Sequence, residues 1–439
     1  MSKVVCKFGG TSMATSRTME QVKNIVLQNR DRHYVVVSAP GKAHKTDTKI
    51  TDLLYRCADE ASKTGQCPSF AAVRERFHGI VSELNLDLDI GAVLNEIETQ
   101  ILATKSADYA ASRGEYLSAY VTAKYLGFEF VDAAELIVFN EKGEFLSNET
   151  NENVARILEG KQYVVIPGFY GRMPNGAIKT FSRGGSDITG AIIARGVLAD
   201  IYENWTDVDG FLVTDPRIVE DPEQIYCLSY KELRELSYMG ASVLHAESIF
   251  PVSVSAIPIH IKNTFHQDNP GTMIVPSISG VPDDGRPITG IAGKKGFTEI
   301  KIEKDLMNEE VAFIRKVLSV MERHHLSVEH TPTGIDTLTV IVDAKHVTHL
   351  EMQEIVRELE ADVNPDLVEI VSNISLIATV GRNVVNNRDT ASRLFGALSR
   401  NRIEVRMIDQ GSSGLNIIIG VDDNDFDRAI KAIYQEFYQ

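Results

Sequence analysis

Short runs of β-branched residues alternate with longer amphipathic stretches between Val4 and about Ile274. Three of these runs cover residues 35–37, 163–166 and 201–202. Strands separated by helix-length segments predict a mainly parallel α/β sheet with helices on both faces. Ligands of such sheets bind beyond the carboxyl ends of the strands, so the polar residues that follow each run are the first candidates for a functional site.

The composition of the sequence changes between residues 276 and 296. Pro276, Pro282 and Pro287 fall in this segment together with five glycines, which is typical of a connector. The chain has 439 residues, more than one hydrophobic core usually serves, so two or three domains are expected. We place a first domain at residues 1–280 and the linker at 281–296.

The chain repeats itself after this linker. Six apolar positions match at a constant offset of 77 residues: Met321, Leu326, Val328, Leu338, Val340 and Val342 correspond to Leu398, Ile403, Val405, Leu415, Ile417 and Ile419. Each copy has a helical pattern followed by two alternating strands. Solenoid repeats are shorter, at about 20–50 residues, so the period predicts a duplicated α+β domain over residues 297–371 and 372–439.

Charge and composition exclude several classes of function. Sixty-one acidic against 45 basic side chains give a formal charge of −16, which disfavours nucleic acid as a partner. The four cysteines have no C-x-x-C spacing, which indicates reduced thiols. No apolar run reaches about 18 residues, and the N-terminus begins with a strand pattern instead of a signal peptide. We expect a soluble cytoplasmic protein that binds neither nucleic acid nor membrane.

The segment Lys7-Phe8-Gly9-Gly10-Thr11-Ser12 follows the apolar run 4–6. Glycines let backbone N–H groups approach an anion, a following helix start adds partial positive charge, and the lysine adds a point charge. Taken alone, two glycines at a strand end are usually a turn. Together with two further segments, this one predicts a phosphate site.

The second segment is Ser182-Arg183-Gly184-Gly185-Ser186-Asp187, which precedes an apolar helical pattern. Arg183 can hold a carboxylate through two hydrogen bonds, and Asp187 can accept from an ammonium group. Together they would suit the zwitterionic end of an amino acid. Ser186 or Asp187 is equally suited to cap the helix, and the two roles are compatible.

The third segment runs from Trp205 to Arg217 and contains W-T-D-V-D-G and T-D-P-R. Its hydroxyls, carboxylates and arginine follow the strand 201–202 and suit the ribose, the phosphates or the magnesium of a nucleotide. Asp-Gly and Asp-Pro are also common in ordinary turns, so this segment is not specific by itself.

The motifs as an ordered set resemble the aspartate kinase family of the amino acid kinase superfamily. They are K-F-G-G-T-S, S-R-G-E at 112–115, S-R-G-G-S-D at 182–187, W-T-D-V-D-G with T-D-P-R, V-L-H at 243–245 and N-T with P-G-T at 263–272. The C-terminal copies resemble tandem ACT domains, which have a ferredoxin-like α+β fold. The resemblance covers essentially the whole chain.

This resemblance implies transfer of the γ-phosphoryl group of Mg-ATP to the side-chain carboxylate of L-aspartate, giving 4-phospho-L-aspartate, the first step of lysine, threonine and methionine biosynthesis. A carboxylate is already ionised at pH 7, so no general base is required. The site must instead overcome the repulsion between two anions, which calls for lysine, backbone N–H groups and metal. Magnesium would enter with ATP, and we expect no permanent metal site.

The resemblance also implies residue roles. Catalysis falls to Lys7, Gly9, Gly10 and Asp187, with Lys7 neutralising the phosphoryl group and the glycines donating N–H groups to it. Substrate binding falls to Thr51, Glu115, Arg183, Gly184, Gly185, Ser186 and Asp187, with Arg183 on the α-carboxylate of aspartate. ATP binding falls to Lys7, Gly9, Gly10, Ser12, Thr206, Asp207, Leu212 and Arg217.

Regulation is implied by the ACT-like copies, which in this family bind an amino acid where two copies pair. The matching effector stretch is Met307, Glu310, Ala312, Phe313, Ile314, Glu329, Thr333 and Gly334. Met307, Phe313 and Ile314 could equally be core residues, because apolar residues at helical spacing are more often core. By analogy we favour lysine over threonine as the inhibitor, and a homodimer or higher homo-oligomer formed through the ACT domains.

Two positions depart from the family pattern. Ser242 stands where relatives have a lysine that contacts the nucleotide, and Leu212 stands where a tyrosine is common. The alternatives are a related kinase with another acceptor, such as glutamate, acetylglutamate, carbamate or uridylate, and a non-catalytic amino-acid sensor. The paired ACT-like copies and S-R-G-G-S-D argue against the first, and Lys7, Glu115 and Asp187 argue against the second.

Overall fold

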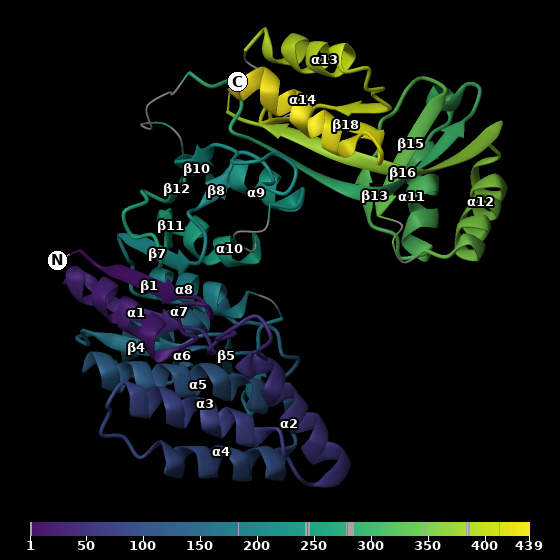
Figure 1. The fold of residues 1–439 in the computed structure, drawn as a ribbon. Helices are drawn as coiled ribbons and strands as arrows, with labels where there is room; N and C mark the ends of the chain where they lie inside the picture. The colour runs from purple at the N-terminus through teal and green to yellow at the C-terminus, as the bar shows by residue number, and fades with distance from the viewer. Residues whose placement is uncertain are drawn as a thin grey trace. The chain divides into compact units, whose positions relative to one another are not determined.

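The computed structural model describes residues 2–182, 184–241, 244, 246–277, 279, 285–343, 345, 347–382, 384, 387–411 and 413–439. The chain divides into two compact units (Figure 1). Unit 1 comprises Met1–Phe211, Tyr226–Tyr230 and Ser242–Val281. Unit 2 comprises Leu212–Ile225, Lys231–Ala241 and Pro282–Gln439. Among the described residues, no helix has both the length and the apolar character that crossing a membrane requires.

Unit 1 is built on an eight-stranded sheet with the strand order β10-β12-β11-β7-β1-β2-β4-β3. Its strands are β1 (Val4–Phe8), β2 (Arg32–Val37), β3 (Glu129–Phe130), β4 (Val164–Pro167), β7 (Ile201–Thr206), β10 (Cys227–Ser229), β11 (Ile259–Asn263) and β12 (Thr272–Val275). Neighbouring strands are parallel except for β11 with β12. The predicted mainly parallel α/β sheet is confirmed.

Helices cover both faces of this sheet. They are α1 (Ser16–Gln28), α2 (Ile50–Thr64), α3 (Phe70–Glu83), α4 (Ile90–Thr104), α5 (Ala107–Leu126), α6 (Ala133–Leu136), α7 (Ser147–Ile157), α8 (Gly185–Gly196) and α10 (Ala246–Val254). Cys6 and Phe8 pack into the core formed with α1 to α5. Side chains alternate along a strand, so Lys7 lies on the opposite face, where α8 packs against β1.

Two two-stranded sheets and one further helix complete the part of the chain before the repeat. They are β5 (Tyr170–Arg172) with β6 (Ile178–Thr180), β8 (Phe211–Leu212) with β9 (Gln224–Ile225), and α9 (Tyr230–Tyr238). Residues 212–225 and 231–241 belong to unit 2, although the sequence placed them in the first domain. Long-range bonds hold them there: Ile291 N donates to Val213 O at 2.7 Å, and Thr289 Oγ1 donates to Glu232 Oε1 at 2.6 Å.

Unit 2 contains a six-stranded sheet with the order β14-β15-β13-β16-β18-β17. The first copy consists of β13 (Gly290–Glu303), the 3-10 helix η1 (Met307–Glu309), α11 (Phe313–Arg323), β14 (Val328–His330), β15 (Thr337–Asp343) and α12 (His349–Val363). The second consists of β16 (Leu367–Val380), α13 (Thr390–Arg400), β17 (Met407–Asp409), β18 (Asn416–Asp422) and α14 (Phe426–Tyr438). Figure 1 shows β13 and β16 running side by side through both copies.

The repeat is confirmed, but its offset is not constant. Helices α11 and α13 begin 77 residues apart, as do α12 and α14. In the sheet, Ile300 pairs with Val340 and Ile377 pairs with Ile419, so Val340 corresponds to Ile419 and not to Ile417. The predicted correspondence of the last strands was therefore wrong by two residues. An even shift keeps every side chain on its own face, so the apolar pattern could not reveal it.

The predicted linker is also partly a strand. Strand β13 begins at Gly290, and residues 290–294 pair with residues 376–380 of β16 in the second copy. Gly293 resembles linker sequence, but here a Cβ atom would lie 2.6 Å from the ring of Phe426, so close packing requires the glycine. The predicted boundary at 371/372 falls inside β16, which serves both copies.

Candidate active site

Lys7 on β1, Asp187 on α8 and Asn204 on β7 form the centre of the candidate site. Strands β1 and β7 pair in register, so Lys7 lies beside Asn204. Lys7 Nζ lies 2.5 Å from Asp187 Oδ1 and donates to Asn204 Oδ1 at 3.5 Å, while Asn204 Nδ2 donates to Asp187 Oδ1 at 2.9 Å. The side chains of Lys7 and Asp187 are only 8% and 14% exposed, and charges this buried require pairing.

The glycine turn after β1 packs backbone against backbone with a second turn. Gly41 N donates to Gly10 O at 2.8 Å, and a Cβ atom at position 41 would lie 2.8 Å from Gly10 C. Gly9 N donates to Trp205 O at 3.1 Å, so the N–H of Gly9 serves the sheet. Gly10 and Thr11, in contrast, line a cavity.

The helix that follows this turn is capped by its own residues. Helix α1 starts at Ser16, and Thr15 caps it: Thr15 Oγ1 accepts from Thr18 N, and Thr18 Oγ1 accepts from Thr15 N. The first-turn N–H of Thr18 is therefore satisfied internally. Four residues, Thr11 to Ala14, lie between Gly10 and the capping residue Thr15, so the helix does not begin directly after the glycines.

The cavity beside the glycine turn has a volume of about 480 Å³. Residues 38–42, three side chains of the following loop (His44, Lys45 and Lys49), Thr51 and Glu115 line it, together with Gly10 and Thr11. Lys42, Lys45 and Lys49 make the lining strongly basic, which suits an anionic substrate. The structure thus brings Thr51 and Glu115, predicted substrate residues from different helices, to one cavity.

Glu115 is buried on α5 and 6% exposed, and its Oε2 has no hydrogen-bond partner among the described residues. Burial raises the pKa of Glu115 to about 8, although a hydrogen bond from the backbone N–H of Ala39 lowers it in part. Gly114 lets helix α5 pack closely against the turn at Ala39, because a Cβ atom at position 114 would lie 2.8 Å from Ala39 Cβ. At neutral pH the group is therefore mostly a neutral carboxyl in a basic cavity.

The start of α8 is packed closely against the strands. Gly184 caps the helix with φ of +59°, and Ser186 Oγ lies 2.7 Å from Ser38 Oγ at the end of β2. A Cβ atom at Gly185 would lie 2.4 Å from the ring of Phe169, so this position requires glycine. Arg183, the predicted partner of the substrate α-carboxylate, lies outside the described residues, as does Ser242.

The predicted ATP-binding residues fall into two groups. In unit 1, Thr11 Oγ1 donates to Asp207 Oδ2 at 3.0 Å, and Thr206 Oγ1 donates to Asp207 Oδ1 at 3.3 Å. Ser12 is fully buried and lies 2.8 Å from Thr264 Oγ1, so it joins two of the motifs.

The second group belongs to unit 2. Leu212 lies in the short strand β8, and the side chain of Arg217 is 86% exposed. The guanidinium of Arg217 is paired with Asp215 at 2.5 Å. For these two residues, contact with ATP stays a prediction.

The predicted effector residues all lie in unit 2. Met307 and Phe313 belong to the hydrophobic core of the first copy, whereas Ile314 is 41% exposed. Ala312 caps α11 with φ of +67°, and residues 333–334 form the turn before β15. For Met307 and Phe313, the core interpretation is therefore correct.

Two carboxylates of this stretch already have partners. Glu310 binds both Lys304 and Lys316. Glu329 accepts a hydrogen bond from the hydroxyl of Tyr238, a residue of α9 that is distant in sequence. An effector that recruits Glu310 or Glu329 would have to displace these partners.

Sequence reasoning missed Asn204 and the basic loop. Glu203 and Asn204 are two adjacent polar residues in the middle of strand β7, and this is the signal that could have identified Asn204. The three lysines of the loop, Lys42, Lys45 and Lys49, follow directly after the turn at the end of β2. The carboxyl ends of parallel strands meet at one edge, so this position alone is a signal for a ligand site.

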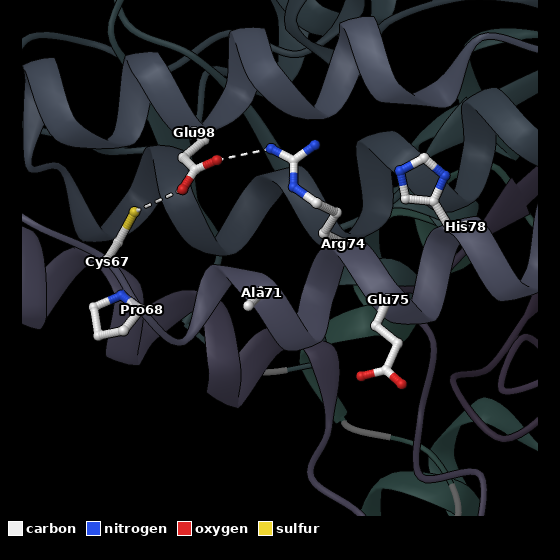
Figure 2. Close-up of a pocket in the computed structure, with 7 residues that line it drawn as sticks. All are labelled: Cys67, Pro68, Ala71, Arg74, Glu75, His78 and Glu98. Atoms are coloured by element: carbon white, nitrogen blue, oxygen red, sulfur yellow. Dashed lines mark hydrogen bonds and ion pairs between the residues drawn. The ribbon is translucent and has the colours of Figure 1, made fainter.

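Another cavity in unit 1, of about 380 Å³, lies between the start of α3 and α4 (Figure 2). Arg74 donates to Glu98 Oε2 at 2.7 Å, and Cys67 Sγ lies 3.8 Å from Glu98 Oε1. Burial, followed by the negative charge of Glu98, raises the pKa of Cys67 to about 11. These groups bind one another, so we assign no ligand to this cavity.

Family models match most of the chain. The model described as the amino acid kinase family matches residues 2–263, and an ACT domain model matches residues 377–437. The first match covers the glycine turn, the Lys7–Asp187 pair and every strand of the eight-stranded sheet except β12. The chain therefore belongs to the amino acid kinase family.

Individual relatives narrow this assignment. The chain is 38% identical to Aspartokinase 3 of Bacillus subtilis (strain 168), with 99% of this chain and 98% of that protein covered. It is similar to the solved structure of Clostridium acetobutylicum aspartate kinase, with 48% identity, a TM-score of 0.90 and both chains fully covered. It is also similar to E. coli aspartokinase III, with 25% identity, a TM-score of 0.76 and both chains fully covered. Within the family, the chain belongs to the aspartokinases, and it is an enzyme.

Proposed function

We propose that this chain transfers the γ-phosphoryl group of Mg-ATP to the side-chain carboxylate of L-aspartate, giving 4-phospho-L-aspartate. The observation that carries the proposal is the buried Lys7–Asp187 pair beside the glycine turn. The structure of E. coli aspartokinase III, which is similar over the whole chain, was solved in complex with aspartate and ADP. This supports the same pair of ligands here.

The reaction joins two anions, so the site needs positive charge and hydrogen-bond donors more than it needs a base. Lys7 would neutralise the transferring phosphoryl group, and the N–H groups of the turn at Gly10 would donate to it. Asn204 would keep Asp187 and Lys7 in place when the phosphoryl group draws the ammonium away from the carboxylate. Asp187 would then be available to the α-ammonium of aspartate.

The remaining substrate contacts would come from the basic cavity. Arg183 would hold the α-carboxylate of aspartate, and Thr51 would orient the molecule through its hydroxyl. Glu115, when it is protonated, can donate a hydrogen bond to a carboxylate, whereas its ionised form would repel one. We therefore assign Glu115 to aspartate orientation in its neutral form.

Magnesium would arrive with ATP, and the residues present fit it. Asp207 accepts only hydroxyl hydrogen bonds, from Thr11 and Thr206, in the described contacts. Hydroxyl donors can rotate away, which leaves carboxylate oxygens of the kind that Mg²⁺ prefers. The metal would supply charge neutralisation on the phosphates. Arg217 and Leu212 would contact the nucleotide from their own segment.

The reaction is tested by trapping the acyl phosphate with hydroxylamine in the presence of Mg-ATP and aspartate. We expect signal with aspartate, and none with glutamate or N-acetylglutamate in matched reactions. Removing Mg²⁺ with a chelator should abolish the signal. Equal signal with glutamate would assign the chain to another acceptor, and no signal with any acceptor would favour an amino-acid sensor.

Regulation is the finer part of the proposal. We propose that an amino acid, lysine in preference to threonine, inhibits the enzyme through the stretch Met307–Gly334 of the first ACT copy. E. coli aspartokinase III was also solved in complex with lysine and aspartate, which supports this choice. Inhibition requires that the effector bind an inactive state more tightly than the active one. Assays with lysine, threonine and both together test it, and indifference to all would refute it.

We also propose a catalytic domain over residues 1–280, a homodimer or larger homo-oligomer formed through the ACT copies, a cytoplasmic location and a role in lysine, threonine and methionine biosynthesis. Analytical ultracentrifugation tests the assembly. We expect the full-length chain to sediment as a dimer or a larger assembly, and a monomeric mass would refute this part of the proposal.

A further inference from the structure

The two ACT copies differ in the side chains at one matching structural position. In the second copy, helix α14 begins with Phe426, whose side chain is 5% exposed. Its ring lies against Gly293, where a Cβ atom would be only 2.6 Å from Phe426 Cε2. The Lys295 ammonium lies 4.8 Å from the centre of the same ring. The second copy therefore fills this position with an aromatic side chain and places a cation over it.

The corresponding position of the first copy has different side chains and borders a pocket. The repeat offset of 77 residues holds for these elements, so His349 at the start of α12 corresponds to Phe426, and Ile370 on β16 corresponds to Gly293. A cavity of about 300 Å³ lies here, and both His349 and Ile370 line it. In the first copy a pocket thus lies beside the position that Phe426 fills in the second.

The lining of this pocket has two chemical halves. Phe297, Val347, Met352 and Ile370 supply apolar surface. Lys345 and His349 supply cationic or cationisable groups, and no carboxylate belongs to the lining that the structure describes. Lys345 keeps a distant partner, Asp343, at 3.7 Å, and its side chain is 47% exposed. At the start of α12 the backbone N–H of Thr348 already donates to the Glu351 carboxylate at 2.7 Å, so the positive charge of the pocket comes from the two side chains.

We propose that this pocket binds a small carboxylic acid that carries an aromatic ring. The ring packs against Ile370 and Met352, next to the position that Phe426 fills in the second copy. The carboxylate lies toward Lys345 and His349. The volume of about 300 Å³ is at the lower end for a small-molecule site, which suits a single ring. None of the lining residues belongs to the predicted effector stretch Met307–Gly334, so this is a separate site.

The binding test uses 3-phenylpropionate and its uncharged amide, 3-phenylpropanamide, with the full-length protein in isothermal titration calorimetry. We expect saturable binding of the acid with a Kd of about 1 mM or below, and about tenfold weaker binding of the amide. The variant Lys345→Met should reduce the affinity for the acid to that of the amide and leave the amide unchanged.

The decisive variant gives the first copy the residues that the second copy has at the two matching positions. His349→Phe combined with Ile370→Gly supplies a ring and the glycine beneath it, so the pocket should fill itself and lose at least about tenfold in affinity for both ligands. Glu354→Phe is the matched control, because it adds a ring to an exposed position of the same helix outside the pocket. It should bind as the unaltered protein does.

Two results would overturn the proposal. One is the absence of saturable binding of 3-phenylpropionate to the unaltered protein. The other is undiminished binding by the filled variant when its circular dichroism and urea unfolding match those of the unaltered protein. The binding test does not depend on kinase activity. Its result can therefore refute this inference without refuting the proposed function, and the reverse also holds.

Discussion

Glu115 should make the stability of unit 1 depend on pH. Its pKa is raised to about 8 from an ordinary value of 4.5, chiefly because the fold buries it. A carboxyl group with a raised pKa contributes stability that is fully present below the unfolded pKa and is lost as the pH rises through the folded pKa. The affected window therefore runs from about pH 4.5 to pH 8.

The size of the effect follows from these two values. Between pH 6 and pH 8 the unfolded state keeps Glu115 ionised, while the folded state goes from mostly neutral to half ionised. Each pKa unit of difference corresponds to about 1.4 kcal/mol, so the free energy of unfolding should fall by about 2 kcal/mol over this range. With a urea dependence of about 3 kcal/mol per molar, the unfolding midpoint should fall by about 0.7 M.

The assay is urea unfolding followed by tryptophan fluorescence. The chain has one tryptophan, Trp205, which is buried in the core of unit 1, so its emission reports on this unit. Glu115→Gln cannot ionise and should abolish the difference between pH 6 and pH 8 that Glu115 causes. Glu152→Gln, at an exposed position of α7, should keep it. If both variants lose stability equally with rising pH, the reasoning about Glu115 is wrong.

Three further changes test other parts of the structure. Lys7→Ala should lower kcat by about 10²-fold or more without changing the circular dichroism, because it removes the charge that faces the phosphoryl group; a near-normal kcat would exclude Lys7 from the mechanism. Gly114→Ala should destabilise by about 1–3 kcal/mol, since its Cβ atom would meet Ala39, whereas Gly79→Ala, with open space around it, should be neutral or stabilising in the same melt. Arg32→Met should cost about 3–5 kcal/mol by leaving Glu203 buried without its ion pair, and adding Glu203→Gln should recover part of this loss; no recovery would contradict that explanation.

The candidate site shows how far local reasoning reaches. The composition of their turns predicted anion binding at Lys7 and amino-acid binding at Asp187, and the family resemblance implied that both are catalytic. Their ion pair could not be predicted, since it depends on α8 packing across β1. Asn204 was missed for the same reason: its role exists only because β7 pairs in register with β1. The raised pKa of Glu115 likewise arises from burial by elements distant in sequence.

The repeat shows the same limit within unit 2. The matching apolar residues revealed two copies, because alternation and helical spacing are local properties. The two-residue shift that pairs Val340 with Ile300, and Ile419 with Ile377, was invisible to them. The strand at residues 290–294 read as a linker, because its glycines have no apolar side chains to form a pattern.

The amino-acid sequence by itself determined the α/β class, the duplicated C-terminal copies and the motifs that carry the chemistry, since these follow from side-chain periodicity and from turn residues next to one another in the chain. Only the tertiary structure decided which of those motifs share a site and which segments join the other unit. Strand pairing and helix packing bring distant residues to within a few ångströms, and no local pattern encodes that distance.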